Sequence, residues 1–292
     1  MSGENKLFRP KEYFKPTTTA EAVKLLAQYG EKARLIAGGT DLLVEKDYEI
    51  EVLIDITGLG LDYIKSDGQG VKIGAASTFA NIEVAPSLGK SPYNILAQAA
   101  HQLGTPQIRN VATIGGNICY AVPSADSAPP LLALDATVNI AGPAGERSMD
   151  ITDFFLDVRQ TALKRGELLT EIQLPASPAR TEAVFIKKGR VATGDLAIVN
   201  TAVRLTMSTD GVCQEARITL GAVAPVPLRA KKAEAMLQGK KPQDELLSKV
   251  ADQAVQEIRP ISDVRSSAEY RKVLSRVLVE RALKEVATRL SA

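Results

Sequence analysis

The sequence predicts an α+β protein with two domains, and three observations support this prediction. The chain has 292 residues, a length that suits about two domains. Helical and strand patterns alternate up to residue 174, whereas the chain from residue 183 onward shows three strand patterns followed by three helical ones. The run Pro175–Pro178 between these parts has the composition of a linker. We therefore expect domains at 1–178 and 179–292.

The composition excludes several classes of protein. Hydrophobic residues make up 45% of the chain and charged residues 24%, as in ordinary globular proteins. The 36 Lys and Arg residues nearly balance the 34 Asp and Glu residues and form no basic block, so nucleic acid is not an expected partner. No run approaches the roughly 18 apolar residues of a membrane span, and the first 14 residues contain no apolar signal segment. We expect no membrane span and a cytoplasmic location.

The chain offers little material for a metal site or a catalytic triad. Cys119 and Cys213 lie far apart, without the spacing that holds an iron–sulfur cluster or a structural zinc. His101 is the single histidine, and we interpret it as an ordinary residue of a helix. We expect no metal ligands and no catalytic side chain here. The chemistry is instead expected from a bound cofactor.

The first domain is predicted to contain two α/β subdomains, about 1–57 and 58–178. A helix over 18–29 begins the first one, because Thr18 and Glu21 have the spacing of a capping box and Gly30 ends the apolar pattern. Its other elements are strands over 33–37 and 52–56. The second subdomain is expected to have an irregular segment over 104–126, a hairpin over 63–75, helices over 77–85, 92–103 and 130–134, and strands near 136–141, 146–150 and 168–174.

The second domain is predicted to be α+β as well. Three strand patterns come first, and the turn at Thr209–Gly211 joins the second and third. Three helices follow, of which the last has apolar residues at helical spacing. The predicted elements are strands over 183–189, 196–207 and 212–220, and helices near 229–238, 243–258 and 266–290.

Two glycine pairs indicate nucleotide binding. Gly38 and Gly39 follow a predicted strand, and Gly115 and Gly116 follow Thr113 in a second, similar loop. Such turns let a ligand approach the backbone, and their N–H groups bind anions. A diphosphate needs several converging donors, which two loops could supply from both sides. Each pair alone could be a structural turn, but the two together, with Asp126 downstream as an acceptor for sugar hydroxyls, favour a nucleotide cofactor.

The common nucleotide motifs are missing. Gly58 and Gly60 follow a predicted strand, but the third glycine of a dinucleotide fingerprint is replaced by Tyr63. No phosphate-binding loop of the GxxxxGK[ST] type occurs either. These absences favour a rarer nucleotide-binding fold.

The order of several motifs resembles one family, the FAD-binding medium subunits of molybdenum hydroxylases. This family includes the flavoprotein subunits of aerobic carbon monoxide dehydrogenase and of bacterial xanthine dehydrogenase-type enzymes. The resemblance covers nearly the whole chain. It rests on Ala37–Asp41, Thr113–Asn117, Pro123, Asp126, Leu131–Ala136, Gly166–Leu169 and Lys187. It implies a vanillyl-alcohol-oxidase-like (PCMH-type) FAD domain of two α/β subdomains, followed by a C-terminal α+β domain of the carbon monoxide dehydrogenase flavoprotein type.

The resemblance also implies which residues bind FAD. The diphosphate would be enclosed from two sides by Arg34, Leu35, Ile36, Ala37, Gly38, Gly39, Thr40 and Asp41, and by Thr113, Gly116 and Asn117. Leu103, Gly104 and Leu169 would line the pocket. Asp126 would bind a hydroxyl group, and Lys187 would lie near the cofactor.

Some of these positions also fit a simpler interpretation. Leu169 lies in an alternating strand and could be a core residue, and Lys187 beside Lys188 could be a solvated lysine. Ile118, Cys119 and Tyr120 follow the second loop, where the edge of the flavin ring is expected, and the sequence does not choose among them. Cys119 could equally pack as a small apolar side chain.

The function implied by the resemblance is electron transfer. A large subunit with molybdopterin would oxidise the substrate, and a small subunit would pass electrons through [2Fe–2S] clusters to FAD on this chain, in a heterotrimer or its dimer. The chain lacks the cysteine-bearing loop found in 4-hydroxybenzoyl-CoA reductase, so that extra cluster is not expected. Two alternatives are a stand-alone FAD-dependent oxidoreductase acting on a small organic substrate, and a nucleotide-binding scaffold without activity.

Overall fold

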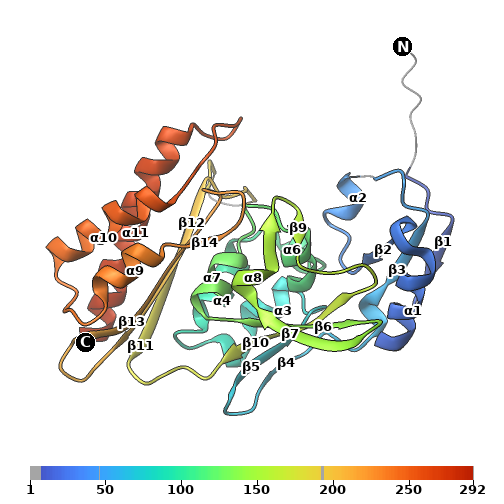
Figure 1. Ribbon diagram of the computed structural model, residues 1–292, viewed down its shortest axis with the longest axis horizontal. Helices are drawn as coiled ribbons and strands as arrows, with labels where there is room; N and C mark the ends of the chain where they lie inside the picture. Colours follow the sequence, from blue (N-terminus) through green and yellow to red (C-terminus); the bar gives the residue numbers. More distant parts are fainter. Residues whose placement is uncertain (1–7, 46, 192–193, 292) are drawn as a thin grey trace.

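The computed structural model describes residues 8–45, 47–191 and 194–291. Within these ranges the strands form a three-stranded, a five-stranded and a four-stranded sheet, and one small two-stranded ribbon. Figure 1 shows the three larger sheets following one another along the molecule, from the N-terminal part to the C-terminal helices. The mixed α+β class is confirmed.

The first unit is a small parallel sheet beside one long helix. Strand β3 is central and pairs in parallel with both neighbours, in the order β1-β3-β2. All four residues of β3 are buried. The elements are β1 (Glu12–Phe14), α1 (Thr19–Tyr29), η1 (Gly30–Lys32), β2 (Ala33–Ile36), α2 (Leu42–Glu45), β3 (Val52–Asp55) and η2 (Ile56–Gly58). Strand β1 was not expected from the sequence, whereas β2 and β3 were.

Helix α1 begins and ends as the capping pattern predicts. The Thr18 hydroxyl accepts a hydrogen bond from the backbone N–H of Glu21 at 3.2 Å. The Glu21 carboxylate reaches back to the N–H of Thr17 rather than to that of Thr18. Gly30 ends the helix with a φ of +59°, a conformation that glycine adopts at little cost. The first predicted helix is therefore confirmed.

The second unit is an antiparallel sheet in the order β4-β5-β10-β6-β7, packed against a group of short helices. The predicted hairpin is confirmed, with Ile64 opposite Ile73. Its strands are β4 (Ile64–Ser66), β5 (Gly70–Gly74), β6 (Thr137–Gly142), β7 (Gly145–Asp150) and β10 (Leu168–Pro175), and a ribbon of β8 (Phe155–Asp157) and β9 (Gln160–Thr161) was not expected. Its helices are α3 (Phe79–Val84), η3 (Pro86–Leu88), α4 (Asn94–Gln102), α5 (Pro106–Arg109), α6 (Ile114–Tyr120), α7 (Ala128–Ala133) and α8 (Ile151–Phe154).

The segment 104–126 differs from its prediction as an irregular loop, because it contains the two short helices α5 and α6. Gly115 and Gly116 form the first turn of α6 instead of a turn after a strand. Thr113 caps this helix by accepting a hydrogen bond from the N–H of Gly116 at 3.1 Å. A Cβ at Gly115 would lie 2.5 Å from the carbonyl oxygen of Ala75. Close packing against Ala75, the residue after β5, therefore explains why a helix with two unfavourable glycines forms here.

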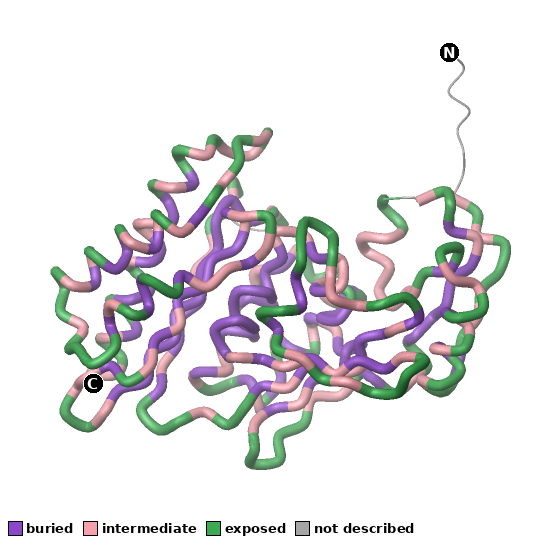
Figure 2. Tube along the Cα trace, in the orientation of Figure 1, coloured by how far each residue is buried: buried purple, intermediate pink, exposed green. Residues whose placement is uncertain are grey.

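The third unit is an antiparallel sheet covered by helices on both faces. Its strands are β11 (Thr181–Lys188), β12 (Val199–Met207), β13 (Cys213–Gly221) and β14 (Leu228–Arg229), and the helices that follow are α9 (Lys231–Leu237), α10 (Asp244–Glu257) and α11 (Ala268–Ser291). Helices α9, α10 and α11 cover one face, and α4 and α7 of the second unit contact the other. Figure 2 shows β12 buried along its length between these layers.

The second and third units share one hydrophobic core. Ala183, Phe185 and Ala202 of the third sheet pack into the same cluster as the helices α3, α4 and α7. Asp135, just after α7, accepts hydrogen bonds from Arg204 at 2.5 Å and Arg217 at 2.7 Å. Apolar packing and ion pairs thus fix the third sheet on the second unit. The domain boundary at residue 178 stays a prediction.

Candidate functional site

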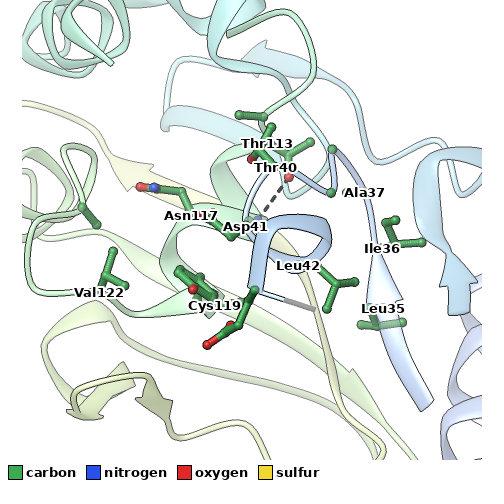
Figure 3. Close-up of a pocket in the computed structure, with 18 of the residues that line it drawn as sticks. Leu35, Ile36, Ala37, Thr40, Asp41, Leu42, Thr113, Asn117, Cys119 and Val122 are labelled. Carbon is green, nitrogen blue, oxygen red and sulfur yellow. Dashed lines mark hydrogen bonds between the residues drawn. The ribbon is translucent and has the colours of Figure 1, made fainter. Parts of the chain in front are cut away.

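One large cavity lies between the first and the second unit, with a volume of about 790 Å³. This volume lies in the range of typical ligand sites. Figure 3 shows Leu35, Ile36 and Ala37 on one side of it, with Asn117 and Cys119 of α6 facing them. The cavity therefore lies where the two predicted subdomains meet.

All but one of the predicted binding residues line this cavity. The residues that do so are Arg34, Leu35, Ile36, Ala37, Gly38, Gly39, Thr40, Asp41, Leu103, Gly104, Thr113, Gly116, Asn117, Cys119, Asp126 and Leu169. Lys187 lines a small neighbouring cavity of about 220 Å³, which shares Gly194 and Asp195 with the large one. The two glycine segments, far apart in sequence, thus lie on one cavity. Their role in binding a cofactor stays a prediction.

Gly38 brings the two walls into contact. A Cβ at this position would lie 1.9 Å from the carbonyl oxygen of Val111, so only glycine fits without moving the backbone. Gly39 has a φ of +68°, in the region that favours glycine. The first loop therefore depends on both glycines, one for space and the other for backbone conformation.

The backbone donors of the two walls are used differently. In the second wall the N–H groups at the start of α6 are already bonded, that of Ile114 to Ser77, that of Gly115 to Ala75 and that of Gly116 to Thr113. In the first wall the N–H groups of Gly38–Asp41 have no hydrogen-bond partner among the described residues. Free backbone donors for an anion therefore come from the first loop, although donors from both loops were expected.

Two side chains, those of Asn117 and Asp41, add polar groups to the large cavity. The Asn117 oxygen accepts a hydrogen bond from the Ser127 hydroxyl at 2.6 Å, which directs the amide and leaves its N–H groups as donors. Burial raises the pKa of the half-buried Asp41 carboxyl, and the Glu45 carboxylate adds to this effect. Asn117 can therefore donate to an anion, whereas Asp41 can accept from a hydroxyl.

The three residues after Asn117 differ in their surroundings. Cys119 and Tyr120 line the cavity, whereas Ile118 is fully buried in the hydrophobic core. Burial raises the pKa of the Cys119 thiol to about 12, so this group is a neutral thiol at physiological pH. Burial also raises the pKa of Tyr120, and the nearby Glu45 carboxylate adds to this effect.

A contact between α2 and the β8–β9 ribbon forms part of the cavity wall, and sequence reasoning missed it. Arg159, at the tip of the ribbon, forms an ion pair with Glu45 and lies over the Tyr120 ring at 5.1 Å. Its backbone N–H donates to the Ala121 carbonyl at 2.9 Å. Arg159 has a φ of +58°, which non-glycine residues rarely adopt. No local motif marks these residues, because the contact joins segments 114 residues apart.

Asp126 and Lys187 form a buried ion pair. The Lys187 ammonium lies 2.6 Å from Asp126 Oδ2, and the two side chains are only 7% and 5% exposed. Lys187 also donates to the Gln102 carbonyl at 2.9 Å, and Asn200 Nδ2 donates to Asp126 Oδ1 at 3.0 Å. The interpretation of Lys187 as a solvated lysine is therefore wrong. Leu169 is buried in the core and also lines the cavity, so both of its interpretations apply.

Outside the cavity, His101 lies on α4 with its side chain largely exposed and contacts Glu83 at 2.7 Å. This agrees with its interpretation as an ordinary helical residue. In the described ranges no three His, Cys, Asp or Glu side chains gather as metal ligands would. No helix there has the length and apolar character that a membrane crossing needs.

Two family models match the chain. The model for the FAD binding domain in molybdopterin dehydrogenase matches residues 7–177. The model for the CO dehydrogenase flavoprotein C-terminal domain matches residues 185–286. Together they cover both parts of the fold.

Curated relatives match over most of their length. The carbon monoxide dehydrogenase medium chain of Hydrogenophaga pseudoflava is 35% identical over 93% of this chain and 95% of that protein. The xanthine dehydrogenase FAD-binding subunit of Escherichia coli O157:H7 is 31% identical over 94% of each chain. The nicotinate dehydrogenase FAD-subunit of Eubacterium barkeri is 37% identical over 78% of this chain and 79% of that protein.

Solved structures share the whole fold. Carbon monoxide dehydrogenase from Hydrogenophaga pseudoflava matches with a TM-score of 0.92 at 35% identity, over 97% of this chain and 99% of that chain. Quinoline 2-oxidoreductase from Pseudomonas putida 86 matches with a TM-score of 0.90 at 29% identity, over 98% of this chain and 100% of that chain. The expected fold, an FAD-binding domain followed by a flavoprotein C-terminal domain, is confirmed.

Proposed function

The chain belongs to the family of FAD-binding medium subunits of molybdenum hydroxylases, and from this we propose that it is the FAD-carrying electron-transfer subunit of such a complex. Electrons from the [2Fe–2S] clusters of a small partner subunit pass through this chain to an external acceptor. A large partner subunit with molybdopterin oxidises the substrate. The observation that supports this most strongly is that both glycine segments line the same large cavity.

The residues of the cavity suit FAD. The free backbone donors of Gly38–Asp41 and the Asn117 amide are suited to bind a diphosphate. The absence of a Cβ at Gly38 lets the two walls of the site meet. When bound, FAD supplies the exchange of single electrons for electron pairs. The chain's own part is to hold the cofactor, orient it and shield it from water.

Three acids of the cavity are held in ion pairs, Glu45 with Arg159, Asp126 with Lys187, and Glu167 with Arg147. The stand-alone oxidoreductase is not supported, because the relatives are FAD subunits of larger complexes. The names of the relatives indicate different substrates, namely carbon monoxide, xanthine and nicotinate. Such variety among similar FAD subunits fits the proposal that another subunit selects the substrate. We also propose a cytoplasmic location.

Purification of the tagged chain from its own cells tests this proposal. We expect FAD on the chain, together with a large subunit containing molybdenum and a small subunit containing iron and acid-labile sulfur. Reduction of the small subunit's clusters should then reduce the flavin. A chain that is purified alone, and whose FAD is reduced directly by organic substrates, would overturn the proposal.

A further inference from the structure

The third sheet reaches the wall of the FAD cavity through one buried carboxylate. Asp126 lies in the second unit and is 4% exposed, yet both of its oxygens are bonded by side chains of the third sheet. Lys187 of β11 binds Oδ2 at 2.6 Å, and Asn200 of β12 binds Oδ1 at 3.0 Å. These two residues are directly opposite each other in the β11–β12 ladder, so their side chains point to the same face.

Asn200 is an unusual residue for its position. It is fully buried near the start of the inner strand β12, and its Oδ1 has no hydrogen-bond partner among the described residues. A Cβ at the opposite residue, Gly221, would lie 2.2 Å from that oxygen, so the side chain fits tightly into its slot. An unpaired buried polar atom is unfavourable. Within the part of the chain that the structure describes, the only hydrogen bond of the Asn200 side chain is the one to Asp126.

We infer that Asn200 is a positioning residue of the cofactor site, which together with Lys187 fixes the carboxylate of Asp126 at the cavity wall. This inference depends on the proposed binding of FAD. Two donors on different oxygens prevent rotation of the carboxylate. Each oxygen keeps another lone pair, so the fixed group can still accept a hydrogen bond from a cofactor hydroxyl. The third sheet thereby fixes a polar group in a cavity that lies mainly between the first two units.

The neighbouring Thr201 provides a matched control. It is also fully buried in β12, and its hydroxyl donates to the Thr219 carbonyl at 2.8 Å. Successive residues of a strand point to opposite faces, so Thr201 points away from Asp126. Thr201→Val and Asn200→Leu each remove one buried hydrogen bond from the same strand. Only the second change removes a bond to the cavity wall.

The test is a titration of the full-length chain, freed of cofactor, with FAD. Hydrogen bonds to charged groups are among the stronger ones, so we expect Asn200→Leu to weaken FAD binding about ten-fold. Thr201→Val should stay within about two-fold of the wild type, even where it lowers the melting temperature as much. In an Asp126→Asn background, Asn200→Leu should have little further effect, because the two residues act through one contact.

Three results would overturn the inference. They are wild-type affinity in Asn200→Leu, an equal loss in Thr201→Val, and additive losses in the double variant with Asp126→Asn. If Asn200→Leu does not fold, Asn200→Ala removes the same donor without added bulk and is judged by the same criteria. Failure of the wild-type chain itself to bind FAD would instead refute the proposed function, and the inference with it.

Discussion

Substitution of Gly38 by alanine tests directly whether the two glycine segments form one binding site. The added Cβ would lie 1.9 Å from the Val111 carbonyl oxygen, 2.6 Å from the Val111 carbonyl carbon and 3.0 Å from the Ala112 Cα. All three atoms belong to the backbone, so no side-chain rotation relieves the clash. Because ordinary contact begins at 3.4 Å, the walls would have to separate by about 1.5 Å.

Such overpacking typically costs about 1–3 kcal/mol. If this cost falls on the FAD-binding form of the site, the dissociation constant for FAD should rise by about 5–150-fold. The melting temperature of the cofactor-free chain should fall by about 2–4 °C for each kcal/mol. The measurement is a fluorescence titration of the chain with FAD, with unfolding followed in parallel.

The matched control is Gly89→Ala. Gly89 is exposed and does not line the cavity, and its Cβ would lie 3.3 Å from the Pro86 carbonyl, so the crowding there is mild. We expect FAD binding within about two-fold of the wild type in this control. If Gly38→Ala bound FAD as tightly as Gly89→Ala, the meeting of the two walls would have no role in binding.

Two further predictions concern titratable groups. The raised pKa of the Cys119 thiol, about 12, predicts that its alkylation is slow at neutral pH and becomes about ten-fold faster for each pH unit. Because Cys119 lines the cavity, bound FAD should block this alkylation. Labelling with and without FAD, with Cys119→Ser as control, measures both effects, and equal labelling would contradict a cofactor beside Cys119. The backbone N–H of Arg265 and the side chains of Arg271 and Arg265 lower the pKa of Asp263 to about 2, against an ordinary value of 3.8. The ionised form therefore stabilises the fold above about pH 4, and this stability is lost as the pH falls through 2. After allowance for solvent screening, Asp263→Asn should lower the free energy of unfolding by about 1 kcal/mol at pH 7 and by much less near pH 2, and a difference independent of pH would refute this explanation.

Local signals in the sequence were sufficient for elements whose ends are fixed by nearby residues. Helix α1 is an example, because its start depends on Thr18 and Glu21 and its end on Gly30. The three-residue strand β1 has no such signal and exists because β3 offers it a parallel partner. Helix α6 even opposes its local signal, since Thr113 and the contact of Gly115 with Ala75 outweigh the two glycines.

In the candidate site, too, some residues could be predicted from local sequence and others could not. The glycine segments could be located from the sequence because both have the composition that a backbone-binding loop needs. The orientation of Asp126 by Asn200 could not, because the two residues are 74 positions apart and asparagine in a strand carries no signal of its partner. The pairing of Arg159 with Glu45 was hidden for the same reason, since only the folded chain brings α2 to the β8–β9 ribbon.

The measurement that tests the central claim most directly is the cofactor content of the purified full-length chain. The chain is incubated with FAD, separated from free cofactor and examined by its visible spectrum, and the cofactor released by heat is identified by mass. We expect one FAD per chain, bound without a covalent link. A chain that is folded by circular dichroism but retains no flavin would contradict the account, because the large cavity would then not be a flavin site.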